Sequence, residues 1–185
     1  MELSFLNKKQ KAPQTEKELI DLAKKDSRYF APIYKKYHEQ IFRFIYQRLD
    51  SQQDAKDITS QTFLKALVNL KKYQHKGFPF SSWLYKIALN EINQFYRTQA
   101  KKRTVNVNEN QLKEVIDEVC ELYDETKQQQ LVGALANLSS EKLLLIEMRF
   151  FEKRTFKEMA QILDITENNA KVKTYRAIDE LKKLM

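Results

Sequence analysis

Apolar residues recur at helical spacing along the first hundred residues of the chain. They lie three or four positions apart in residues 30–49, 54–73 and 80–97, which places them on one face of a helix. We therefore predict three helices over these stretches, preceded by a shorter helix near residues 15–27. Together they are expected to form one compact domain over residues 15–100.

The pattern weakens in residues 101–130, where seven acidic residues outnumber five basic ones and aromatic residues become scarce. We predict a linker there, with one short helix. At ~3.3 Å per residue, 25 residues of linker can extend to ~80 Å, which is more than two turns of duplex DNA at ~34 Å each. Helical spacing returns over residues 131–138, 139–151, 155–163 and 165–181, and we predict a second domain over residues 131–185.

Composition supports an all-α fold with two small helical domains joined by a flexible linker. Only two glycines and three prolines occur in 185 residues, whereas sheet proteins use many turns built from these residues. The single cysteine, Cys120, excludes a disulfide framework and a cysteine-rich zinc site. No apolar run approaches the ~20 residues of a membrane span, and the first residues lack the apolar core of a signal peptide. We expect a cytoplasmic protein without membrane insertion.

The net charge of +8 is unevenly distributed. Residues 71–103 contain eight lysine and arginine residues but a single acid, Glu91. A run of this kind favours a polyanionic partner such as nucleic acid. A solvated helix face explains the same charges equally well.

The stretch ITENNAKVKTYRAIDEL, residues 165–181, predicts a helix with two different faces. On a helical wheel, Ala170, Thr174, Ala177 and Leu181 share one narrow sector, which we expect to pack inward. The opposite side and its edges carry amide, basic, small apolar and aromatic groups, which suit the base edges of the major groove. These outward residues are Asn168, Asn169, Lys171, Val172, Lys173, Tyr175 and Arg176.

The preceding stretch, TFKEMAQIL, predicts the first helix of a helix-turn-helix. Asp164 follows it at the position that needs a left-handed backbone, which Asp and Asn tolerate at some cost. Ile165 can fill the angle between the two helices. Thr166 is placed to cap the second helix, whose N-terminus favours a phosphate.

Two stretches of the first domain also indicate binding surfaces. In DAKDITSQTFLKAL, Asp54 and Asp57 lie three positions apart and share one helix face, although acids in a first turn also suit the helix dipole. In FSSWLYKIALNEINQFYR, a polar side with Lys86, Asn90 and Arg97 alternates with Trp83, Tyr85 and Tyr96. Cations beside aromatic rings are typical of single-stranded nucleic acid binding. Trp83 fits a core position better, while Tyr85 and Tyr96 fit core and stacking positions alike.

Taken together, these motifs resemble bacterial RNA polymerase sigma factors of the small extracytoplasmic-function (ECF) type. DAKDITSQTFLKAL resembles the region 2 helix that binds the clamp helices of the polymerase β′ subunit. FSSWLYKIALNEINQFYR resembles the next helix, which takes part in −10 recognition and strand opening, and residues 135–181 resemble region 4, which recognises the −35 element. The resemblance covers nearly all of residues 20–184.

The resemblance implies three sets of binding residues and no catalytic chemistry or cofactor. Core polymerase, through its β′ clamp helices and β flap, and promoter DNA, both duplex and single-stranded, are the implied partners, together with an anti-sigma factor. The set implied for core polymerase is Asp54, Asp57, Gln61, Phe63 and Leu64. The set implied for the −10 strand is Gln74, His75, Lys76, Phe78, Lys86, Asn90, Arg97, Lys101, Lys102 and Arg103, with the loop 73–80 holding a flipped base. The −35 set is Thr166, Asn168, Asn169, Lys171, Val172, Lys173, Tyr175 and Arg176.

The chain departs from the usual pattern of this family at several positions. Ser60-Gln61 replaces a common glutamine-glutamate pair, and Gln94 stands where an aspartate is usual. Asp164 stands where the helix-turn-helix often has glycine. Lys153-Arg154 replaces the small, flexible residues that often precede the first helix of that motif.

Other classes of protein explain the sequence less completely. A helix-turn-helix regulator with an N-terminal helical partner domain explains the second half but not the aromatic and basic stretch at residues 80–97. An enzyme acting on nucleic acid would need clustered carboxylates or an activated nucleophile, and neither His38 nor His75 has a partner at ligand spacing. A purely structural helical scaffold leaves the outward face of residues 168–176 without a purpose.

Overall fold

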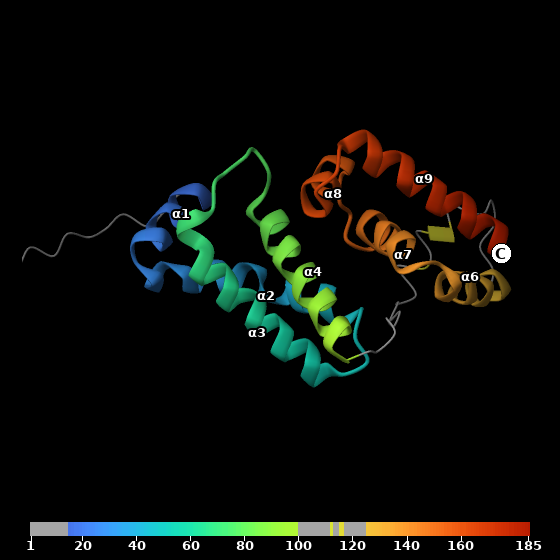
Figure 1. Ribbon diagram of the computed structural model, residues 1–185, viewed down its shortest axis with the longest axis horizontal. Coiled ribbons are helices and arrows are strands. Elements are labelled where there is room, and N and C mark those ends of the chain that lie inside the picture. The colour runs from blue at the N-terminus through green and yellow to red at the C-terminus, as the bar shows by residue number, and fades with distance from the viewer. Residues whose placement is uncertain (1–14, 100–111, 113–114, 117–124) are drawn as a thin grey trace, which may run out of the picture.

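The computed structural model describes residues 15–99, 112, 115–116 and 125–185, and every regular element in these ranges is helical, as predicted (Figure 1). The N-terminal unit, residues 15–99, comprises α1 (Glu16–Lys25), η1 (Ser27–Tyr29), α2 (Phe30–Tyr46), α3 (Gln52–Asn69), η2 (Leu70–Lys72) and α4 (Phe80–Gln99). The C-terminal unit, residues 125–185, comprises α6 (Glu125–Asn137), α7 (Ser140–Ile146), the π-helical turn η3 (Glu147–Phe151), α8 (Phe156–Leu163) and α9 (Glu167–Leu184).

Hydroxyl side chains define where most of these helices begin. Thr15, Ser51, Ser139, Thr155 and Thr166 each accept a hydrogen bond from the backbone N–H three residues further on. Each bond satisfies one of the N–H groups that a helix N-terminus leaves without a partner. The cap predicted for Thr166 is therefore present.

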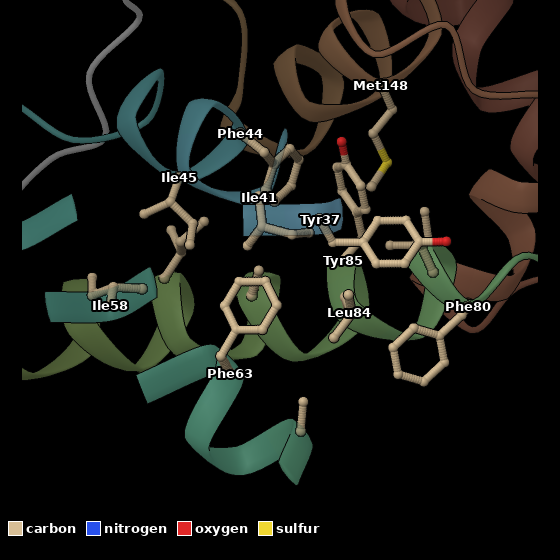
Figure 2. Close-up of a cluster of buried hydrophobic side chains, with 14 of the residues drawn as sticks. Tyr37, Ile41, Phe44, Ile45, Ile58, Phe63, Phe80, Leu84, Tyr85 and Met148 are labelled. Carbon is tan, nitrogen blue, oxygen red and sulfur yellow. The ribbon is translucent and has the colours of Figure 1, made fainter. Parts of the chain in front are cut away.

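The core of the N-terminal unit lies between α2, α3 and α4 (Figure 2). Phe44 meets Tyr85 edge to face, with ring centroids 4.6 Å apart, a geometry that aromatic pairs favour. Side chains at helical spacing fill the remaining space, among them Ile41, Ile45, Ile58, Phe63, Phe80 and Leu84.

The C-terminal unit has a second core between α6, α7 and α9. It is built from Leu131, Leu135, Leu143, Ile146, Ile178 and Leu181. Leu112, Val115 and Ile116 belong to the same core and have helical backbone, within the stretch predicted to be a linker with one short helix. α6 begins at Glu125, also within that stretch. Cys120 lies outside the described residues.

The two units also share apolar packing. α8 lies against α4, and side chains from α7, η3 and α8 complete the core of the N-terminal unit. Figure 2 shows Met148 of η3 reaching the side chains of α2 and α4 from the other unit. The contributing residues of the C-terminal unit include Leu144, Leu145, Met148, Met159, Ala160 and Ile162. The described chain is thus one folded body with two units.

Candidate nucleic-acid interface

The turn between α8 and α9 has the geometry of a helix-turn-helix. Asp164 ends α8 in the left-handed conformation (φ 59°, ψ 45°), as predicted, and its N–H donates to the carbonyl of Ala160. The N–H of Ile165 donates to the same carbonyl (3.0 Å), and its half-buried side chain packs on the core. Thr166 then caps α9 by accepting from the N–H of Asn169 (3.2 Å). The exit angle of α9 is therefore fixed by backbone bonds and one apolar contact.

α9 has the two faces that the sequence predicts. Ala170, Thr174, Ala177, Ile178 and Leu181 are buried. Of the predicted −35 residues, Thr166, Asn168, Asn169, Lys171, Val172, Tyr175 and Arg176 are exposed. Lys173 is half-buried at the edge, and its Nζ pairs with Glu141 (2.5 Å). No acid occurs from Asn168 to Arg176, so the exposed face offers donors, small apolar groups and positive charge.

The loop between η2 and α4 forms a second polar surface around a cavity of about 450 Å³. Gly77 has φ +77°, a backbone conformation that side chains other than glycine rarely adopt. Tyr73, Phe80 and Trp83 form an aromatic cluster with ring centroids 5.0–5.3 Å apart. Of the predicted loop residues, Gln74, His75 and Lys76 are exposed and Phe78 is half-buried. The cavity is lined by Tyr73, Gln74, Lys76, Phe78, Trp83, Lys86 and Gln161, among others.

The outer side of α4 only partly follows the sequence prediction. Asn90 and Arg97 are exposed, and Arg97 donates to Gln94 of its own helix. Lys86 is half-buried and pairs with Asp164 of the other unit (3.4 Å). Lys101, Lys102 and Arg103 lie outside the described residues. The structure therefore gathers Lys86 with the loop residues, while Asn90 and Arg97 lie further along the same helix.

The two tyrosines that the sequence left open between core and stacking positions both make internal contacts. Tyr85 is fully buried, and burial raises the pKa of its hydroxyl, with a further contribution from the Glu152 carboxylate. Tyr96 donates to the backbone carbonyl of Arg48. Trp83 is half-buried in the aromatic cluster. Of the three, Trp83 alone lines the loop cavity.

Glu91, the one acid of the basic run at residues 71–103, is held in an ion pair and is not a free negative charge. Its side chain is 7% exposed, and both carboxylate oxygens accept from Lys65 Nζ (2.6 and 2.7 Å). Sequence reasoning missed this pair because Lys65 lies 26 positions away on α3. The occurrence of a single acid among eight basic residues is the feature of the sequence that could have indicated this ion pair.

α3 presents a mixed acidic and apolar surface. Asp54, Asp57 and Gln61 line one shallow cavity of about 230 Å³, so the structure brings together three of the residues assigned to polymerase binding. Leu64 is 60% exposed. Val68, which sequence reasoning did not select, is 70% exposed one helical turn further on.

Phe63 does not belong to this surface. Its side chain is 3% exposed and packs against Phe30 and Tyr34 of α2. The polymerase role of Phe63 came from the family resemblance alone. Its helical spacing places it on the core face of α3, which also buries Ile58 and Ala66. The direct polymerase contact assigned to Phe63 is therefore not available in this structure.

The described residues contain no group of three or more His, Cys, Asp or Glu side chains placed to hold a metal ion. Among the helices that the structure describes, none has both the length and the apolar character needed to cross a bilayer.

The fold and these surfaces define a two-unit helical DNA-binding protein with a C-terminal helix-turn-helix. Family models agree: residues 33–102 match sigma-70 region 2, and residues 134–183 match sigma-70 region 4. The chain belongs to the sigma-70 family and is an RNA polymerase sigma factor of the ECF type.

Relatives of known function are similar over most of the chain. The ECF RNA polymerase sigma factor BldN of Streptomyces coelicolor is 25% identical over 158 residues, which are 84% of this chain and 60% of BldN. The RNA polymerase sigma factor YlaC of Bacillus subtilis is 26% identical over 156 residues, covering 83% of this chain and 90% of YlaC. The chain thus spans less than two thirds of BldN but nearly all of YlaC.

Two solved structures share the fold. CnrH, in complex with the cytosolic domain of CnrY, superposes with a TM-score of 0.60 at 19% identity, covering 90% of this chain and 94% of CnrH. The sigma factor RpoE of Bartonella quintana, in complex with the anti-sigma factor NepR, has a TM-score of 0.60 at 17% identity, covering 84% of this chain and 95% of RpoE.

Proposed function

We propose that the two units divide promoter recognition between them: the C-terminal unit binds the −35 duplex through α9, and the N-terminal unit binds the opened −10 strand and core polymerase. The observation that carries this proposal is the exposed, acid-free face of α9, the second helix of the helix-turn-helix, whose N-terminus is capped by Thr166. The protein acts by binding, without catalysis of its own, and works in the cytoplasm where core polymerase is found.

In the −35 complex, the exposed side chains of α9 contact base edges in the major groove. Arg176 and Lys171 donate to guanine, Asn168 or Asn169 pairs with adenine, and Val172 meets a thymine methyl group. The N-terminus of α9 adds a phosphate site, because its N–H groups and helix dipole favour an anion. The β flap of the polymerase holds this unit in place.

In the −10 complex, the loop cavity beside the aromatic cluster receives a flipped base of the non-template strand. Flipping costs a few kcal/mol of stacking, and stacking on an aromatic side chain returns about 1–3 kcal/mol per base. Trp83 and Phe78 line the cavity, and Lys76 and Lys86 lie beside it to hold phosphates. Asn90, Arg97 and the basic residues 101–103 continue the path of the strand.

The exposed surface of α3 binds the clamp helices of the β′ subunit. Asp54, Asp57 and Gln61 supply charge and hydrogen bonds for basic side chains, and Leu64 and Val68 supply apolar area. An anti-sigma factor is a further partner; the likeness in fold to RpoE, which was solved in complex with the anti-sigma factor NepR, supports it.

Transcription with purified core polymerase on a library of promoters tests this function. We expect the chain to convert core enzyme into a holoenzyme that initiates at a defined set of sequences, while the chain alone binds duplex DNA weakly. Weak isolated binding is expected because two modest binding sites gain affinity when they are linked on one larger assembly. A helix-turn-helix regulator would bind its operator tightly without polymerase and would not direct initiation by core enzyme.

A further inference from the structure

The C-terminal unit covers the first turns of α4 with a set of polar contacts. The Tyr85 hydroxyl donates to Glu152 (2.5 Å), and the Arg154 guanidinium lies over the Tyr85 ring at 4.1 Å. Arg154 also donates to Ser81 (3.4 Å). We call the set Ser81, Tyr85, Lys86, Glu152, Arg154 and Asp164 the interdomain cluster; its last pair joins Lys86 to Asp164 (3.4 Å).

A buried ion pair lies beside this cluster. Arg48, which follows α2, pairs with Glu147 of η3 at 2.7 Å, and the two side chains are 0% and 1% exposed. The Arg48 guanidinium also lies over the Phe44 ring at 3.7 Å. Charges removed from water in this way are tolerated when they are paired, and separating them requires each to be hydrated again. The contact between the units is therefore specific, with matched charges at fixed positions.

Two residues of the cluster contribute through side chains that a glycine would lack. Arg154 contacts the Tyr85 ring and Ser81. Asp164 pairs with Lys86. The interdomain contact therefore depends on which residues occupy these two positions.

The contact between the units also involves the loop cavity that we propose for the −10 strand. Gln161 of α8 forms part of the wall of the loop cavity, and Lys157 of α8 lies 5.6 Å from the ring centroid of Phe78. Asp164 places a carboxylate on Lys86, where the proposed function places a strand phosphate. A DNA phosphate that pairs with Lys86 must displace the Asp164 carboxylate of the C-terminal unit.

The close packing of the two units also conflicts with the geometry of promoter binding. The −10 and −35 elements are separated by about two turns of duplex, at ~34 Å each. In the structure, α8 of the helix-turn-helix packs directly on α4 of the −10 unit. The two units must separate before each can reach its own element.

We propose that the interdomain cluster and the Arg48–Glu147 pair hold the free chain in an autoinhibited closed state, which opens when core polymerase and promoter DNA bind. This inference rests on the proposed function in naming polymerase and promoter binding as the activities that closure inhibits. That the chain closes does not depend on the proposed function. Under the proposed function, core polymerase holds both units at once, α3 at the clamp helices and the C-terminal unit at the β flap, with each unit at its own promoter element. Because only the open fraction can make both contacts, closure lowers the apparent affinity for the polymerase.

The test compares the full-length wild-type chain with a triple variant, Tyr85→Phe, Glu152→Gln and Asp164→Asn. These changes remove interdomain polar contacts while keeping side-chain size, and Asn retains tolerance of the left-handed conformation at position 164. Small-angle X-ray scattering of each chain alone measures closure; a compact chain of this length has a radius of gyration near 16 Å. Affinity for core polymerase, with and without a forked −10 DNA, measures inhibition. Glu180→Gln is the matched control, because it breaks an ion pair with Lys142 that lies within the C-terminal unit.

We expect the triple variant to have a larger radius of gyration and an apparent Kd for core polymerase about three- to tenfold lower, with Glu180→Gln like wild type in both. An extended wild-type chain, or a triple variant unchanged in size and affinity, overturns the closed state as an inhibitor; so does a triple variant that expands but binds more weakly. If no chain binds core polymerase, the proposed function fails, while scattering still decides whether the chain closes.

Discussion

Asp164 holds a backbone position that glycine occupies more readily than any residue with a side chain. Left-handed backbone costs an ordinary residue ~1–2 kcal/mol, and a short polar side chain reduces this cost. We expect Asp164→Ala to lower the free energy of unfolding by about 1 kcal/mol and Asp164→Gly to change it by less than ~0.5 kcal/mol. Urea denaturation of the three chains measures the difference. Equal midpoints for the alanine and wild-type chains would show that the turn carries no strain.

Arg176 lies on the exposed face of α9, where a guanidinium can contact a guanine. If it reads a base, Arg176→Ala costs about 1–3 kcal/mol and relaxes preference at one promoter position. Holoenzyme binding to promoters varied one base pair at a time measures the loss. Lys182→Ala, at the far end of the same helix, is the control and should leave the pattern of preference intact. A uniform loss over all sequences would assign Arg176 to a phosphate instead.

Lys65 and Glu91 form an asymmetric ion pair, because Lys65 is 55% exposed and Glu91 only 7%. Removing the lysine leaves a buried carboxylate without its partner, whereas removing the acid leaves a lysine that water can hydrate. We expect Lys65→Met to lower the free energy of unfolding by about 2 kcal/mol and Glu91→Gln by less than ~1 kcal/mol. Chemical denaturation of both variants measures the order of the two effects, and the reverse order would contradict the inferred burial.

At the scale of the element, α8 begins with a capping box. Thr155 accepts from the N–H of Glu158 (3.2 Å), and the Glu158 carboxylate accepts from the N–H and hydroxyl of Thr155 (2.9 Å each). Burial alone would raise the pKa of Glu158, but these bonds and the charge of Arg154 outweigh it and lower the pKa below the ordinary 4.5. The carboxylate therefore stabilises the folded chain fully above pH 4.5, and this contribution is lost as pH falls through the folded-state pKa.

The corresponding prediction concerns Glu158→Gln. The variant should be less stable than wild type at pH 6, because an amide is a weaker acceptor than a carboxylate, and the difference should shrink on acidification to pH 3. Urea midpoints at both pH values measure this change; Glu39→Gln, at an exposed site in α2, is the comparison. A difference that is constant with pH would mean that Glu158 does not contribute as an ionised group.

Elements were the part of the structure that the sequence predicted best. Helical spacing located α2, α3, α4, α8 and α9, and the wheel of α9 separated Ala170 and Thr174 inside from Lys171 and Tyr175 outside. These features are local: a repeat of 3.6 residues and a capping hydroxyl act within a few turns of the chain. Phe63 shows the limit, because α3 has apolar residues on more than one side and spacing alone does not say which of them are covered.

Contacts between distant segments were not predictable from one sequence. Arg48 follows α2 and Glu147 lies 99 positions later, and nothing local marks either as buried. The same holds for Leu112, Val115 and Ile116, whose burial depends on a surface formed by α6 and α9. Apolar periodicity indicates that a helix face is buried. Which element covers that face depends on the tertiary fold.

For the whole molecule, the shared core predicts cooperative unfolding. The single tryptophan, Trp83, reports on the N-terminal unit, while far-ultraviolet circular dichroism reports on helices of both units. We expect the two signals to give one coincident transition in urea. Glu147→Ala leaves Arg48 buried without this partner and should lower the free energy of unfolding by about 3–5 kcal/mol. Two separate transitions in the wild-type chain would show that the units fold independently.

A single nucleotide change in the gene can alter the turn residue between α8 and α9. Asp164 supplies the carboxylate that meets Lys86, yet glycine at the same place would satisfy the turn equally well. Aspartate and glycine codons differ by a single nucleotide, so one mutation can remove this contact without unfolding the DNA-binding motif. Natural variation at this position can therefore remove one contact of the interdomain cluster while leaving the turn intact.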